Sequence, residues 1–260
     1  MISLYTTVFN LDKLDVDFDE VFSNWLYYAD EIVIATFRWE HEQVRNKIIK
    51  SKFFDSKKIG LVSRHLEIEQ DVYWEGKLKN AALEACKNEI AIQCDLDERI
   101  SGSKDRFEIC CKVILDHDFP CSIMLPTIDL YEDLDHYINI GHKWYLHTKK
   151  GAYRGSVVWA RKEDGSLDPE KSDTCELIDA DGNLIPCVAK LEFDEDNPKI
   201  IHLGHLDLEY RNRINKFWGK IWNHRDKGKF SADFEPEKVK AGDPRKEKHN
   251  LSQPLWPTIS

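Results

Sequence analysis

Short apolar runs alternate with amphipathic stretches along the first hundred residues. Four runs rich in β-branched and aromatic residues predict buried strands, at residues 2–9, 32–35, 59–62 and 90–94. Between them, apolar side chains recur at helical spacing near residues 18–25, 40–52 and 78–85. This alternation is typical of a mostly parallel α/β sheet flanked by helices. In such a sheet the carboxyl ends of the strands share one edge, where ligands bind.

The rhythm changes after residue 100. One more helix is expected near residues 107–115, followed by a longer strand-like run at 121–130. Residues 131–188 are aromatic and rich in turn formers, which favours a functional lobe built from loops. Residues 208–222 show an apolar stripe opposite a basic face and predict an amphipathic helix. The charged segment after residue 230 reads as a tail.

Composition narrows the class of protein. The chain has 260 residues and a formal net charge of −10, which disfavours a nucleic-acid surface and therefore a nucleic-acid partner. A phosphate-bearing ligand would then need a local positive source, such as a divalent cation held by carboxylates. The 7 cysteines are odd in number and contain no Cys-x-x-Cys pair, so a disulfide framework and a zinc cluster are disfavoured. With no apolar run long enough to span a membrane and no signal peptide, we expect a cytoplasmic protein.

A pair of carboxylates follows the fourth predicted strand. Asp-x-Asp recurs along this acidic chain, but Asp95-Leu96-Asp97 is the copy that directly follows an apolar α/β strand. Extended residues i and i+2 point the same way, so we expect residues 95 and 97 to face one side and share a hard cation. A cation there would neutralise the charge on a departing diphosphate. A solvated turn after the strand is the alternative interpretation.

The segment Lys79-Asn80-Ala81-Ala82-Leu83 is followed by a strand that ends at Asp95-Leu96-Asp97-Glu98. This arrangement resembles GT-A glycosyltransferases, especially family 2-like enzymes. Thr6-Thr7-Val8-Phe9-Asn10, Ala29-Asp30-Glu31-Ile32-Val33-Ile34 and Ile201-His202-Leu203-Gly204-His205 are similar to further segments of that family, in the same order. Together they cover roughly residues 1–215.

The resemblance implies a GT-A fold in a single domain with a C-terminal helix. It also implies that the protein transfers a sugar from a nucleotide-sugar donor to a glycan or other hydroxyl acceptor, with inversion. A UDP-sugar is the default expectation for the donor. Residues 1–100 would be the donor-binding half, 101–205 the acceptor half, 206–230 the C-terminal helix and 231–260 the tail. Mn²⁺ or Mg²⁺ would be the cofactor, with Asp95, Asp97 and His202 as ligands.

The resemblance also implies roles for other residues. The nucleotide sugar would meet Thr7, Val8, Phe9, Thr36, Arg38, Lys79, Asp95 and Leu96. Glu176 would be the catalytic base, with Asp173 in reserve, and the acceptor would meet Trp144, Arg154 and Trp159. A buried strand-end histidine, a surface lysine, a plain loop acid and core aromatics remain the structural alternatives for these positions.

Two departures from the family pattern bear on the donor. Thr36-Phe37-Arg38 stands where the family has an acid that recognises the base, and Thr7 stands where it has a proline. Three other interpretations remain open. They are a non-catalytic sugar- or nucleotide-binding protein, a nucleotidyltransferase, and peripheral membrane contact through the basic helix at 208–222.

Overall fold

A seven-stranded sheet forms the centre of the molecule. The computed structural model describes residues 1–9, 16–65, 74–131, 136–138, 144–155, 176–205 and 246–248. The strand order is β12-β6-β9-β4-β1-β2-β3. Six strands run parallel to one another and β9 runs against them. The strands are β1 (Ile2–Val8), β2 (Glu31–Phe37), β3 (Ile59–Arg64), β4 (Ile90–Gln93), β6 (Ser122–Leu125), β9 (Trp144–Thr148) and β12 (Cys187–Lys190).

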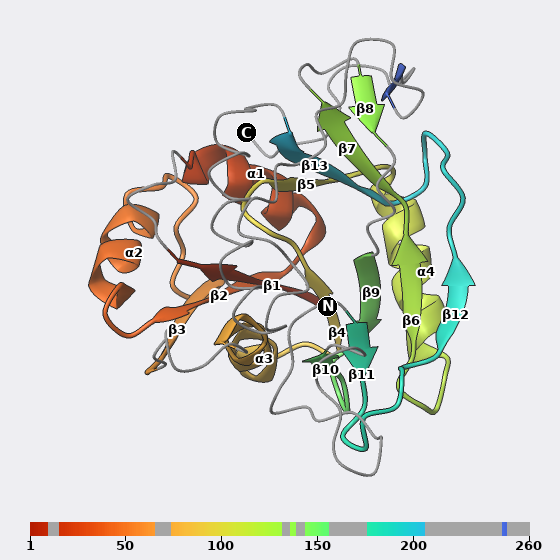
Figure 1. Ribbon diagram of the computed structural model, residues 1–260, viewed down its shortest axis with the longest axis horizontal. Coiled ribbons are helices and arrows are strands. Elements are labelled where there is room, and N and C mark those ends of the chain that lie inside the picture. The colour runs from red at the N-terminus through yellow and green to blue at the C-terminus, as the bar shows by residue number, and fades with distance from the viewer. Residues whose placement is uncertain are drawn as a thin grey trace, which may run out of the picture.

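Helices cover both faces of this sheet (Figure 1). On one face α1 (Phe18–Tyr28), α2 (His41–Ile48) and α4 (Lys104–Leu115) bury a core with the even-numbered side chains of β1 and β2. On the other face α3 (Trp74–Ala85) packs Leu78 and Ala82 against Tyr5 and Val33. A strand buried on both sides needs apolar residues at nearly every position, which explains the unbroken apolar runs of the sequence.

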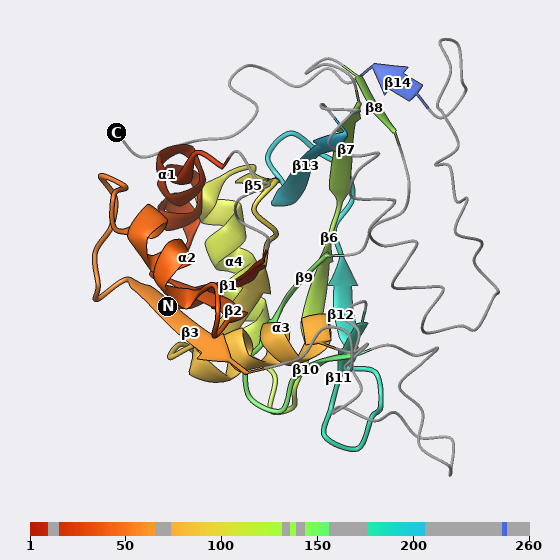
Figure 2. The same ribbon diagram turned by 60° about the vertical axis from the view of Figure 1, so that its left-hand side comes forward.

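A second sheet lies beyond one end of the first (Figure 2). Its order is β14-β8-β7-β13-β5. The strands are β5 (Glu98–Ser101), β7 (Thr127–Tyr131), β8 (His136–Ile138), β13 (Lys199–His205) and β14 (Lys246–Lys248). A small ribbon of β10 (Tyr153–Gly155) and β11 (Glu176–Ile178) stands against α3. Strand β14 shows that part of the predicted tail pairs with β8.

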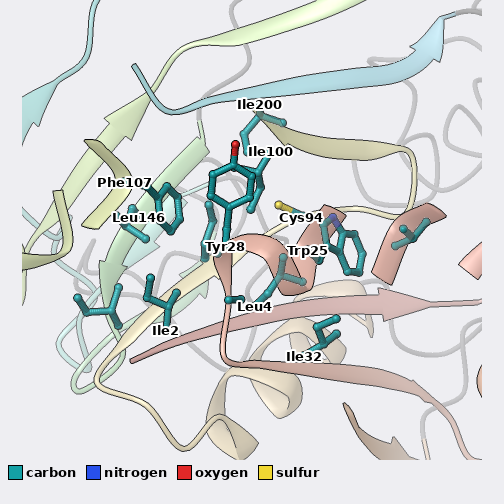
Figure 3. Close-up of a cluster of buried hydrophobic side chains, with 14 of the residues drawn as sticks. Ile2, Leu4, Trp25, Tyr28, Ile32, Cys94, Ile100, Phe107, Leu146 and Ile200 are labelled. Atoms are coloured by element: carbon teal, nitrogen blue, oxygen red, sulfur yellow. The ribbon is translucent and has the colours of Figure 1, made fainter. Parts of the chain in front are cut away.

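Helix α1 ties the two sheets together. The side chain of Asn24 donates to the Ile100 carbonyl and accepts from the Ile100 N–H, both at 2.9 Å, while the Trp25 indole donates to the Glu98 carbonyl. Ile100 and Ile200 join the main core beside Trp25 and Cys94 (Figure 3). The start of β5 is therefore fixed by buried contacts, and with it the segment that follows β4.

The predicted α/β class, a mostly parallel sheet flanked by helices, is confirmed. The expectation of loops throughout 131–188 is wrong in part, because β9 lies inside the central sheet and β10 and β11 form a ribbon. The strand-like run at 121–130 is broken at Pro126 into β6 and β7, which belong to different sheets. The predicted helix at 208–222 lies outside the described residues.

Two further expectations can be compared with the structure. Among the described residues, no helix is long and apolar enough to cross a membrane. The cysteines that the structure describes are free thiols, and all of them except Cys187 are buried. The division of residues 1–205 into donor and acceptor halves stays a prediction.

Gly102 joins β5 to α4 in a conformation that only glycine adopts easily. Its φ is 105°, and a Cβ there would lie 2.4 Å from the Asn197 carbonyl oxygen. We expect Gly102→Ala to lower the free energy of unfolding by at least about 2 kcal/mol, because positive φ and backbone overlap both oppose the methyl group. Gly60→Ala is the matched control, since its added Cβ meets nothing closer than 3.9 Å. Urea unfolding of both variants checks this, and equal effects would contradict it.

Candidate functional site

The site predicted from the sequence lies at the carboxyl edge of the central sheet. β1 ends at Val8 and β2 at Phe37, and their register sets Val8 opposite Thr36. Thr7, Val8 and Thr36 are buried, Phe9 is half-buried, and Arg38 is exposed just beyond β2. The strand order reverses between β1 and β4, which is where an open α/β sheet leaves a ligand crevice. The structure thus brings the predicted nucleotide residues of β1 and β2 to this edge.

The segment after β4 is a tight turn rather than an extended strand. The Glu98 N–H donates to the Asp95 carbonyl at 2.9 Å, and the Glu98 carboxylate accepts from the Asp95 N–H at 2.7 Å. The expectation that residues 95 and 97 point the same way is therefore wrong, because it assumed extended backbone. The turn sends the two aspartates to different partners, with half-buried Leu96 between them.

Asp95 faces α3. Its Oδ1 lies 3.6 Å from the Lys79 ammonium and accepts a hydrogen bond from the Gln93 amide at 3.1 Å. Lys79 is buried, with 4 % of its side chain exposed, and also pairs with Glu75 at 2.9 Å. Burial alone would lower the pKa of Lys79, but the charges of Asp95 and Glu75 outweigh it and raise the pKa. The two sequence segments that carry the family resemblance therefore meet through an ion pair.

Asp97 faces the second sheet. Its Oδ2 lies 3.3 Å from Nε2 of His202 in β13, and the other ring nitrogen of His202, Nδ1, lies 2.8 Å from Oδ1 of Asp129 in β7. Burial opposes charge on both members of the first pair. Their mutual attraction outweighs it, so the pKa of Asp97 is lowered and that of His202 is raised well above its usual value.

Glu98 has a different environment. It is buried and lies opposite His202 in the antiparallel pairing of β5 and β13. Burial, together with the negative charge of Asp95, raises the pKa of Glu98 well above its usual value. Its carboxyl group fixes the turn through the Asp95 N–H, as described above.

The donors at this turn fit a divalent cation in part. Among the described residues, no group of three or more His, Cys, Asp or Glu side chains is arranged to hold a metal ion. Asp97 and His202 nevertheless converge, and a carboxylate behind His202 is the usual support of a metal-bound imidazole. A carboxylate oxygen and an imidazole nitrogen suit Mn²⁺ better than Mg²⁺. Asp95 is held by Lys79, so its role as a ligand stays a prediction.

A second polar cluster lies on the α3 face of the sheet. The Tyr145 hydroxyl donates to Oε2 of Glu176 at 3.3 Å, and burial with the Glu176 charge raises the pKa of Tyr145 to about 12. Arg154 is buried, and its backbone is held by two hydrogen bonds to Asn80 of α3. The positive charge of Arg154 acts on Tyr145 and on Lys79. Glu176 and Arg154 are thus brought together, beside the helix that carries Lys79.

The remaining predicted residues are placed differently. Trp144 is half-buried at the carboxyl edge of the sheet and packs against the core on the face opposite α3. It and Arg154 therefore do not share one face. Asp173 and Trp159 lie outside the described residues, so their predicted roles stay predictions.

Sequence analysis missed Asp129, Glu75 and Tyr145. Asp129 had a signal, because an acid flanked by Ile128 and Leu130 in an apolar strand needs a buried partner. Glu75 had one too, since it precedes Lys79 by one helical turn. Tyr145 had none, because its partner follows 31 residues later in a separate ribbon.

Comparison with family models finds no match, and comparison with curated proteins finds none either. Among solved structures, S. aureus TarS 1-349 is 14% identical over 86% of this chain and 66% of that chain, with a TM-score of 0.36. The inositol-1-phosphate CTP transferase from T. maritima is 10% identical over 81% of this chain and 93% of that chain, with a TM-score of 0.38.

Two further solved structures match this chain at similarly low identity and TM-score. The 4-diphosphocytidyl-2C-methyl-D-erythritol synthase from Anaerococcus prevotii is 12% identical over 82% of this chain and 76% of that chain, with a TM-score of 0.32. Against another structure of S. aureus TarS, the chain matches at 18% identity and a TM-score of 0.31, covering 50% of itself and 21% of that chain. The matched part is thus under two thirds of the TarS chains. Similarities this distant establish no family and no activity.

His147 of β9 contacts Tyr5 of β1 and offers a test of the electrostatics inside the central sheet. It is fully buried, its Nδ1–H donates to the Thr148 carbonyl at 2.7 Å, and the Tyr5 hydroxyl donates to its Nε2 at 3.1 Å. Burial lowers the pKa of His147 to about 3, and the Arg154 charge acts in the same direction. The folded protein therefore holds this imidazole neutral.

The unfolded chain takes up a proton at this histidine near pH 6.5, whereas the folded chain does not until about pH 3. Its contribution to stability is complete above pH 6.5 and is lost progressively as the pH falls. Between pH 7.5 and pH 5, we expect the wild type to lose about 2 kcal/mol more stability than His147→Gln. Urea unfolding at both pH values measures this, and parallel losses in the two proteins would contradict it.

Proposed function

We propose that this chain is a metal-dependent glycosyltransferase that transfers a sugar from a nucleoside diphosphate to a hydroxyl acceptor. The observation that carries the proposal is the convergence of Asp97 and His202 at the carboxyl edge of the sheet, with Asp129 behind His202. The GT-A-like sequence segments support it, because Lys79 and Asp95 come from two of them and meet as an ion pair.

In this proposal Asp97 and His202 hold the cation, and Asp95 lies next to it on the α3 side. When bound, the cation neutralises the charge that builds on the departing diphosphate. The nucleotide lies along the ends of β1 and β2, against Thr7 to Phe9 and near Arg38. Lys79 pairs with Asp95 and holds it in place.

Glu176 is the proposed catalytic base. Tyr145 donates to one oxygen of its carboxylate and so orients the group on the α3 side of the sheet. A carboxylate placed there can accept the proton of the acceptor hydroxyl as the sugar is transferred. Attack on the side of the sugar opposite the diphosphate gives inversion, which the family resemblance also implies.

The first test separates three functions by their products. We expect the protein with Mn²⁺ to release nucleoside diphosphate from one member of a panel of nucleotide sugars, supplied with glycan and other hydroxyl acceptors. Release of pyrophosphate from a nucleoside triphosphate and a sugar phosphate would instead establish a nucleotidyltransferase. Binding of nucleotide sugars without either product would favour a non-catalytic binding protein.

The second test separates metal binding from proton transfer. We expect Asp97→Ala to lose at least about tenfold in Mn²⁺-dependent donor affinity, because it removes a metal ligand. Glu176→Gln should keep donor affinity and lose roughly 10²- to 10⁴-fold in transfer rate, because an amide cannot accept the proton. Asp116→Asn, at the exposed end of α4, is the control. Normal turnover by Glu176→Gln would remove that residue from the mechanism.

A further inference from the structure

We propose that Asp129 is a positioning residue that holds the His202 imidazole with Nε2 directed at the cation shared with Asp97. The inference rests on the metal site of the proposed function and extends it to a residue that no sequence motif marks. It follows from the register of the second sheet, the burial of Asp129 and the two contacts of one imidazole ring.

The register of the second sheet sets an acid on each side of the histidine. His202 pairs with Asp129 of β7 in parallel and with Glu98 of β5 in antiparallel orientation. Directly paired residues of neighbouring strands project from the same face of a sheet. Glu98, His202 and Asp129 therefore form one row across β5, β13 and β7.

The two acids of this row, Glu98 and Asp129, bind different groups. The Glu98 carboxylate accepts the Asp95 N–H at 2.7 Å and so fixes the turn. The Asp129 carboxylate lies 2.8 Å from Nδ1 of His202. Asp129 is 1 % exposed, which makes an acid at this position costly without such a partner. Asp129 is therefore the member of the row that acts on the imidazole.

An imidazole that donates its Nδ1–H to a carboxylate can offer the Nε2 lone pair to a cation. Nε2 of His202 is the atom that approaches Asp97, at 3.3 Å. A carboxylate behind a metal-bound histidine fixes the tautomer and the ring orientation, and raises the basicity of the ligand. Loss of such a carboxylate typically weakens metal binding by about 10- to 100-fold.

The test is a double-mutant cycle on the Mn²⁺ affinity of the full chain. Binding is measured as the decrease in the electron paramagnetic resonance signal of free Mn²⁺, with and without UDP. Asp129→Asn keeps the shape of the side chain and removes its charge. We expect it to weaken Mn²⁺ binding by about 10- to 100-fold. In a His202→Gln background the same substitution should have no further effect, because Asp129 acts through His202. Asp116→Asn is the control for loss of an exposed acid.

The outcomes distinguish this inference from the proposed function. If the wild type binds no Mn²⁺ even with UDP, the metal site fails, and both are overturned. If the wild type binds Mn²⁺ and Asp129→Asn binds it equally well, the inference alone is overturned. An equal loss in the His202→Gln background would likewise overturn it, because Asp129 would then be acting on the fold.

A measurement on the wild type keeps the inference testable if Asp129→Asn does not fold. Nitrogen NMR of the histidine rings with Mg²⁺ and UDP reports which nitrogen of His202 carries a proton. We expect a protonated Nδ1 and an unprotonated, cation-bound Nε2. The reverse pattern would overturn the inference.

Discussion

The turn from β4 to β5 is the constraint on which the rest of the site depends. Its ends are joined by the hydrogen bond from the Glu98 N–H to the Asp95 carbonyl, and the Leu203 N–H donates to the Asp97 carbonyl at 2.7 Å. The turn is thus bound to β13 as well as to itself. It carries the chain from one sheet to the other in four residues, so the two aspartates are held by different layers of the fold. This short backbone segment therefore determines that Asp95 contacts Lys79 and that Asp97 contacts His202.

Charge compensation follows from this geometry. An ionised group in a buried environment requires a partner, and each side of the turn supplies one. On the α3 side, the buried ammonium of Lys79 lies between Asp95 and Glu75. On the other side, the His202 ring lies between Asp97 and Asp129. At the edge where a ligand would bind, one lysine and one histidine therefore each offset part of the negative charge of two acids.

The first hundred residues were predictable largely because β1, β2 and β4 are buried on both faces, whereas the edge strand β3 is only partly buried. Continuous apolar runs such as residues 32–35 are strong signals, and helical spacing marked α1 and α3. Strand β9 gave no such signal although it too packs on both faces, because it is short and its sequence includes the polar residues His147 and Thr148. The second sheet was missed because β5, β8 and β14 have only three or four residues each, and because Pro126 separates β7 from β6 without interrupting the apolar run.

The candidate site was likewise predictable in part from the sequence. Its position at the end of β4 followed from the alternation of strands and helices, since that alternation fixes where the carboxyl ends of the strands meet. The geometry of Asp95 and Asp97 did not follow, because whether a segment leaving a strand stays extended depends on Glu98, which is anchored by α1 through its carbonyl. Asp129 depends on a pairing between strands 73 residues apart, and no local pattern encodes that register.

In the proposed function, a cation held by Asp97 and His202 would let an acidic protein present positive charge to a diphosphate. The charge of a protonated His202 offsets only one of the two carboxylates that the ring contacts, Asp97 and Asp129, so the cluster alone attracts no anion. If Asp97 and His202 hold a divalent cation as proposed, His202 would bind it as a neutral imidazole, because an imidazole must be deprotonated to act as a ligand. Exchange of that proton for the cation would add one net positive charge at the edge of the sheet, beside the ends of β1 and β2. Cation and nucleotide would then favour each other's binding by the same factor, since coupling between two ligands is reciprocal.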